Sequence, residues 1–159
     1  MARRAIKVRI YPDAEQEALL ARTAGACRRV YNLGLEVRKD YYEEDGISVS
    51  TYDLMAMLPL WTEEFPWLAE VPAVALQQSL RNLDRAYVNF FRACRGEGKA
   101  RRPRRKTRNS RKSFRLTKNG FRVKDGQLFI AKSKDPLVFR DKTYVLPENA
   151  SSVTISRDG

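Results

Sequence analysis

Cationic side chains are concentrated in one short stretch of this 159-residue chain. Between Arg92 and Arg122 there are 14 Lys and Arg residues and one acid, Glu97, so this window carries a net charge of +13. The remaining 17 basic and 18 acidic residues nearly cancel. Guanidinium groups suit bidentate contacts with phosphate, and a polyanion that releases condensed counterions is the partner that such a concentration favours. The sequence therefore predicts binding of a sugar-phosphate polymer.

Seven cations in the middle of this window are expected to contact phosphates. They are Arg101, Arg102, Arg104, Arg105, Arg108, Arg111 and Lys112. A solvated, disordered basic run without a specific partner is the alternative interpretation of such a segment. The run lies between a strongly patterned helix and strand-like sequence, and this position favours a connection within a fold.

The other chemistry-bearing residues give little support for catalysis. The sequence has no histidine, which excludes His-based general acid–base work and His metal ligands. Metal-dependent nucleases need several converging carboxylates, whereas the acids here fall in helix caps, in residues 43–45 or in turns. Cys27 and Cys94 lie on apolar helical faces and are expected to be buried thiols. We therefore expect no catalytic residue, metal ligand or cofactor in this chain.

No stretch approaches the roughly 20 apolar residues of a membrane span, and residues 1–5 lead into a strand pattern without a signal-peptide core. We therefore expect a cytoplasmic protein without a membrane partner.

Hydrophobic periodicity predicts three helical stretches in residues 13–95. Asp13 and Gln16 form a capping box that opens a helix to about Glu44, either continuous or broken in two near Gly25. A second capping box at Ser50 opens a short helix that reaches Trp61. Pro59 within that helix marks an early end or a kink. The third helix runs from Pro72 through Arg95 and carries the clearest apolar face, to which Phe90 and Phe91 are assigned.

Period-two patterns predict the strands. They cover residues 5–11, 113–117, 121–123, 127–131, 137–139, 143–146 and 153–156, with Asp125-Gly126 as a hairpin turn. We predict an α+β fold in which residues 1–12 and 113–159 form a small antiparallel β-barrel. A helical insertion of about three to four helices, residues 13–95, interrupts it, and residues 96–112 form a basic connecting loop.

Polar residues on the third helix are candidates for base recognition. Gln77 and Arg81, with Gln78, Asn82 and Arg85, occupy the side opposite the apolar face, although a merely solvated face fits the pattern equally well. Tyr52 is suited to stacking on a base, and a core-edge tyrosine is the alternative. Short helices joined by turns are also compatible with a helix-turn-helix, but no recognition helix stands out.

Several strings together resemble a known family. They are residues 8–12 (VRIYP), 27–32 (CRRVYN), 67–72 (WLAEVP) and 75–91 (ALQQSLRNLDRAYVNFF), followed by the basic loop and residues 113–115 (SFR). Their order and spacing resemble the N-terminal half of TnpB (OrfB) proteins, which are transposon-encoded RNA-guided DNA endonucleases. The resemblance covers essentially the whole chain.

The resemblance implies a wedge-type barrel interrupted by a helical recognition domain. It also implies that the chain holds a guide RNA and double-stranded target DNA and reads a short motif beside the target. In such proteins the residues matching Tyr52, Gln77, Thr117 and Asn119 approach that motif.

The sequence departs from the family pattern at residues 156–159, where it stops. Family members continue into a RuvC-like nuclease domain with three catalytic acids and a four-cysteine zinc module, so the resemblance places Mg²⁺ and Zn²⁺ only in that part. A truncated product, a fragment and a solo binding domain would all look like this chain.

Three hypotheses follow. The first is a guide-RNA- and DNA-binding module of a TnpB-like protein without its own catalysis. The second is part of an active transposase or nuclease. The third is a stand-alone DNA-binding regulator of transcription or transposition that works without RNA.

Overall fold

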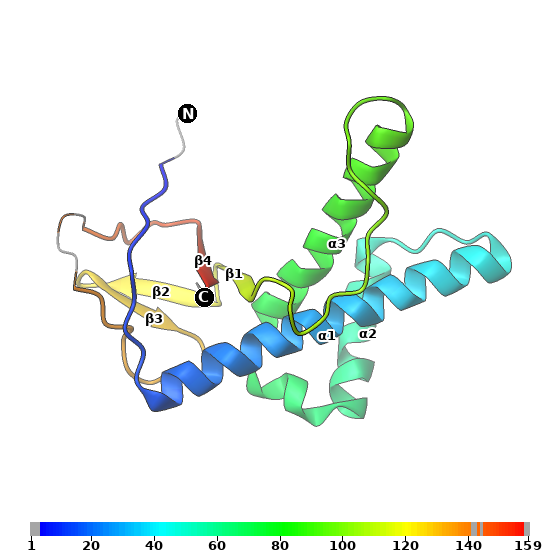
Figure 1. The fold of residues 1–159 in the computed structure, drawn as a ribbon. Helices are drawn as coiled ribbons and strands as arrows, with labels where there is room; N and C mark the ends of the chain where they lie inside the picture. Colours follow the sequence, from blue (N-terminus) through cyan, green and yellow to red (C-terminus); the bar gives the residue numbers. More distant parts are fainter. Residues whose placement is uncertain (1–3, 141–142, 144, 158–159) are drawn as a thin grey trace.

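The computed structural model describes residues 4–140, 143 and 145–157. The helices within these ranges are α1 (Ala14–Asp45), α2 (Thr51–Glu64), the 3₁₀ helix η1 (Pro66–Glu70) and α3 (Ala73–Cys94). The strands are β1 (Ser113–Thr117), β2 (Phe121–Lys124), β3 (Gln127–Ile130) and β4 (Ser152–Ser156). Figure 1 shows α1 extending from the strands across α3, with α2 on the far side. The predicted mixture of helices followed by a small antiparallel sheet region is confirmed.

Both predicted helix starts are confirmed by their capping boxes. The Gln16 amide donates to Asp13 Oδ1 at 2.8 Å, and the Asp13 amide donates to Gln16 Oε1 at 3.0 Å. Ser50 and Asp53 exchange the same pair of bonds at the start of α2. At its other end α1 closes on Gly46, whose φ of 67° lies in the left-handed region that a side chain disfavours.

Of the two alternatives for the first helix, the continuous one is confirmed and the break near Gly25 does not occur, because α1 is one helix of 32 residues. A glycine inside a helix costs only about 1 kcal/mol relative to alanine. Thr23, Ala26 and Cys27 are buried on both sides of Gly25, so packing continues across it. The early end at Pro59 is also wrong, since α2 runs through it to Glu64.

The close crossing of α1 and α3 is the centre of the helical part. A Cβ atom on Gly34 would lie 2.9 Å from Leu80 Cδ2, so only glycine allows this approach. Ser79 Oγ donates to the Cys27 carbonyl at 2.7 Å, and Cys27 Sγ donates to the Ala75 carbonyl at 3.4 Å. These contacts fix the position of α3 on α1.

The strands pair in two antiparallel sheets. β1 pairs with β4, with Phe114 opposite Ile155. β2 and β3 form the predicted hairpin, whose turn residues Asp125 and Gly126 have φ of 52° and 74°. Positive φ at both positions is what a type I′ turn requires. The two-stranded pairs have the order β1-β4 and β2-β3.

The predicted barrel is not observed: in the described ranges the strands do not close on themselves. The first segment, residues 5–11, forms no strand and has one bridge, between Ile10 and Phe139. The Tyr11 amide also donates to the Val138 carbonyl at 2.7 Å. Residues 137–139 likewise contribute isolated bridges only, because this segment is too short to extend a ladder in both directions.

The predicted strand at 143–146 includes residue 144, which lies outside the described residues, and the described members of this segment are in no strand. One hydrophobic cluster nevertheless joins the helical and strand regions, and includes Leu54, Leu80, Leu116 and Leu128. The boundaries of the predicted domains stay a prediction.

Candidate nucleic-acid interface

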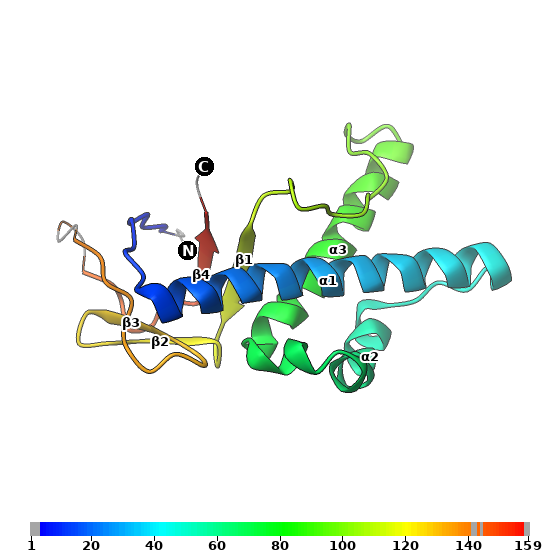
Figure 2. The same cartoon turned by 60° about the horizontal axis from the view of Figure 1, so that its bottom comes forward.

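The basic segment, residues 96–112, connects the end of α3 to β1 without forming a helix or strand of its own. It descends from the tip of α3, passes over α1 and enters β1, as Figures 1 and 2 both show. The seven cations predicted to contact phosphates are all exposed. Within the part of the chain that the structure describes, no ion pair involves any of them. Their charge is therefore uncompensated.

The only acid of the charged window is already engaged. Glu97 lies 3.8 Å from Arg92 Nε and 4.0 Å from Arg95 Nη2. All three side chains are more than half exposed, so these pairs contribute little to stability. They do direct the single negative charge toward the tip of α3, away from Arg101 and the residues after it.

Asn32 on α1 anchors the middle of the basic segment. Its Nδ2 donates to the Lys106 carbonyl at 2.9 Å, and the Lys106 amide donates to Asn32 Oδ1 at 2.8 Å. One side-chain amide thus satisfies both backbone groups of Lys106, as a neighbouring strand would. The anchor divides the exposed cations into those before and those after residue 106.

Lys106 itself turns inward, unlike its neighbours. Its ammonium lies 4.3 Å from the centroid of the Tyr31 ring, in a cation–π contact. Burial lowers the pKa of Lys106 and raises the pKa of the Tyr31 hydroxyl, because both lose hydration of the charged form. Lys106 therefore belongs to the anchor and not to the exposed phosphate-binding set.

Local turns order the segment after the anchor. The Thr107 amide donates to Ser110 Oγ at 3.0 Å, and the Ser110 amide donates back to the Thr107 carbonyl at 3.0 Å. Farther along, the Arg157 amide donates to the Lys112 carbonyl at 3.0 Å. Hydrogen bonds therefore hold the basic segment in a defined conformation at several points.

The predicted base-contacting residues occupy three places. Gln77 and Arg81 are exposed one turn apart on α3. Tyr52 is 75% exposed in the first turn of α2. Thr117 is the last residue of β1, and Asn119 lies in the turn after it with a left-handed φ of 79°. In the described part of the chain no hydrogen bond or ring contact joins Tyr52 to the other four.

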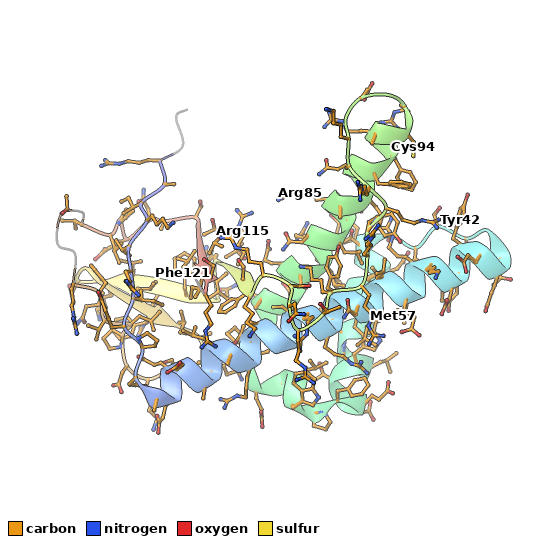
Figure 3. The ribbon with its side chains drawn as sticks, in the orientation of Figure 1. Tyr42, Met57, Arg85, Cys94, Arg115 and Phe121 are labelled. Atoms are coloured by element: carbon orange, nitrogen blue, oxygen red, sulfur yellow. The ribbon has the colours of Figure 1, made fainter. Side chains whose placement is uncertain are left out.

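Two further arginines lie on two of the same elements, α3 and β1. Figure 3 labels Arg85 on α3 and Arg115 on β1, both on the side of the molecule where α3 rises from α1. Arg115 is half-buried and donates to Ser152 Oγ at 3.2 Å, so its guanidinium is oriented by β4. Arg85 is exposed.

Sequence reasoning missed the role of Asn32. The only signal was its place at the end of the string at 27–32, because a polar residue inside a helix is compatible with simple exposure. Its partner is 74 positions away, which no local pattern reveals.

The buried state expected for Cys27 is confirmed, and burial raises the pKa of its thiol to about 12. The same expectation for Cys94 is wrong, since that thiol is exposed near the free end of α3 (Figure 3).

Comparison with known proteins gives consistent matches. Residues 1–46 match the helix-turn-helix domain of OrfB. A protein of Streptomyces pristinaespiralis named "Putative RNA-guided DNA endonuclease" is 42% identical over 162 residues, which cover 98% of this chain and 39% of that protein. InsQ of Escherichia coli, with the same designation, is 38% identical over 90 residues, covering 55% of this chain and 22% of InsQ. The virulence protein VsdF of Salmonella dublin is 36% identical over 97 residues, covering 55% of this chain and 82% of VsdF.

The chain thus spans about two fifths of the length of the first of these relatives. Among the described residues of the matched domain, 4–46, the structure has a single helix, α1. No helix in the described ranges is long and apolar enough to cross a membrane. In those same ranges no three Cys, Asp or Glu side chains gather as a metal ion would need.

Proposed function

Because this chain belongs to the TnpB/OrfB family of transposon-encoded proteins, we propose that it binds nucleic acid by holding a guide-type RNA and the double-stranded DNA which that RNA targets. Support comes from the names of two relatives, which describe RNA-guided DNA endonucleases. The cytoplasm is the proposed location, since both polymers are available there.

One observation carries the proposal: seven exposed cations, for which the described residues provide no ion pair, lie on a segment that is fixed to α1. An anchored segment loses less conformational freedom on binding than a free basic tail does. If all seven contacted duplex phosphates, the logarithm of the binding constant would fall with the logarithm of salt concentration with a slope of about −6. Contacts with a single strand would give a slope of about −5.

Base recognition is proposed for the exposed polar residues on the helices and the turn after β1. Gln77 has the amide that pairs with adenine, and Arg81 one turn away suits guanine or a phosphate. Tyr52, Thr117 and Asn119 are proposed to contact the motif beside the target. Gln77→Ala should relax the preference at one base pair by roughly 1–3 kcal/mol, whereas Gln127→Ala, at an exposed position on β3, should leave it unchanged.

Binding without cleavage is the proposed activity of these 159 residues. The placement of the acids supports it: Asp13 and Asp53 serve in capping boxes, and Asp84 and Glu97 are in ion pairs with arginines. Mg²⁺ and Zn²⁺ are proposed to belong to a part of the family proteins that lies outside these residues. No step proposed here requires either metal.

The test is titration of the purified protein with labelled RNA and duplex DNA over a range of salt concentrations. Replacing Arg101, Arg102, Arg104 and Arg105 by glutamine should weaken all nucleic acids together and reduce the slope by about 3 to 4. The control replaces four exposed lysines elsewhere by glutamine, Lys7, Lys39, Lys124 and Lys134, which changes the net charge equally. Binding that is absent, or independent of salt, contradicts the proposal.

Sequencing of RNA that co-purifies from cells separates a guide-bound module from a DNA regulator.

A further inference from the structure

The apolar stripe of α3 continues beyond the part of the helix that is packed. Leu76, Leu80 and Leu83 are buried, and Leu80 and Leu83 lie close to Gly34 of α1. About two turns later Phe91 is 49% exposed, and Val88, one turn before Phe91 on the edge of the stripe, is 48% exposed. Figures 1 and 2 show this half of α3 projecting away from α1 and the sheets. Phe91 therefore lies on the apolar face to which it was assigned, at an end of that face that is exposed to solvent.

The aromatic rings on this half of α3 are ordered by one another. The Tyr87 and Phe91 rings are stacked with centroids 6.0 Å apart and an interplanar angle of 29°. Phe90 packs against Phe91 at 5.6 Å. Arg38 of α1 lies over Tyr87 at 4.2 Å and is within 3.4 Å of Asp84, which fixes the base of the stack. Phe91 thus stands at the outer end of a supported stack.

The charge around the rings selects the kind of partner. Arg85 and Arg92 are exposed on the same half of α3, Arg95 is exposed directly after it, and Lys99 begins the run of cations in the basic segment. A second copy of this chain would bring the same positive charges together and be repelled. A partner that covers the rings must be anionic and must offer flat apolar groups. Unpaired nucleotides combine both properties, since every base has a face that can stack on an aromatic ring.

We propose that Val88, Phe91 and the supporting Tyr87 and Phe90 form a stacking surface for the unpaired bases of a single strand whose phosphates lie on the basic segment. This inference rests on the proposed function and adds to it a preference for single-stranded over double-stranded nucleic acid. In a duplex the base faces are already covered by neighbouring bases, so this surface contributes to single-strand binding alone.

The experiment compares an unstructured oligonucleotide, such as oligo-uridine, with a duplex of equal length in fluorescence anisotropy titrations. Phe91→Leu keeps an apolar side chain but removes the ring, and should weaken single-strand binding on the order of 5- to 150-fold. Phe91→Tyr keeps the ring and should restore binding. Duplex affinity and the salt slope should stay as in the unaltered protein, because no phosphate contact is lost.

The matched control is Leu60→Ala, which alters another exposed apolar side chain, 63% accessible on α2, away from the charged window. It should change neither affinity. Equal losses for single strand and duplex, or no loss for Phe91→Leu, would overturn the stacking surface while leaving the proposed function intact. Failure of the unaltered protein to bind any oligonucleotide would remove both. Sedimentation that shows self-association lost in Phe91→Leu would instead assign the face to contacts between copies.

Discussion

The anchor of the basic segment offers the sharpest test of the structure, through Asn32→Ala. This substitution removes both hydrogen bonds to the Lys106 backbone, of 2.9 and 2.8 Å. A hydrogen bond in a protein contributes about 1 kcal/mol net, so the anchor should lose about 2 kcal/mol. Both residues are half-buried, so water can replace part of the lost bonding and the loss should not greatly exceed this value. Detachment of the segment at residue 106 should then become roughly 30-fold more frequent.

Limited proteolysis with trypsin measures this detachment through cleavage of the peptide bond after Lys106. Lys106 is covered by Tyr31 and held by Asn32, so cleavage after Lys106 requires that the segment leave α1. Cleavage after Arg104, which is exposed, serves as an internal reference in the same digest. When opening is fast relative to cleavage, the rate after Lys106 follows the open population and should rise by up to about 30-fold. The rate after Arg104 should change little.

Asn89→Ala is the matched control, because Asn89 is an exposed asparagine of α3 that makes no side-chain hydrogen bond within the described residues. It should leave both cleavage rates unchanged. The variant Asn32→Ala should also bind nucleic acid with a smaller salt slope, since fewer cations are held in register. An unchanged rate after Lys106 in Asn32→Ala would refute the anchor, whatever happened to binding.

Three other outcomes follow from the packing and the titrating groups. Gly34→Ala should destabilise the fold by about 1–3 kcal/mol in chemical denaturation, because the new methyl meets Leu80 Cδ2 at 2.9 Å; full stability would contradict the close helix crossing. A thiol reagent at mildly alkaline pH should label Cys94 alone in the native protein and both thiols in denaturant, because burial raises the pKa of Cys27 to about 12; labelling of Cys27 in the native state would speak against this burial. Hydrogen bonds from the backbone amide and hydroxyl of Ser50, the N-cap of α2, lower the pKa of Asp53. The ionised Asp53 therefore stabilises α2 above the usual Asp range, and this stabilisation is lost as pH falls through the lowered pKa. Hydrogen exchange in the first turn of α2 should become faster as pH falls through that value, and Asp53→Asn should show no such change.

Elements set by neighbouring residues were predictable from the sequence. Asp13 with Gln16 fixes the start of α1, and Asp125-Gly126 fixes the hairpin, because each depends on bonds and dihedral angles within a few positions. The net positive charge of the basic segment was predictable for a similar reason, since the sequence places a single acid, Glu97, among the 14 Lys and Arg residues of the window. The early end predicted at Pro59 was wrong because the prediction considered only the local effect of proline. It did not include the burial of Leu54 and Trp61 on either side, which keeps the helix packed.

By itself the sequence determined where most helices start, which turn joins β2 and β3, and where the positive charge is concentrated. The tertiary structure decided what depends on distant partners. Asn32 and Lys106 are 74 positions apart, and Ile10 meets Phe139 only through the folded chain. Helical spacing identified the apolar face that includes Phe91 but not the length over which another element covers that face, and Phe91 is 49% exposed. Local geometry depends on adjacent residues and can be predicted from them. Contacts between remote segments depend on which of many possible pairings packs best, and a local pattern does not contain that information.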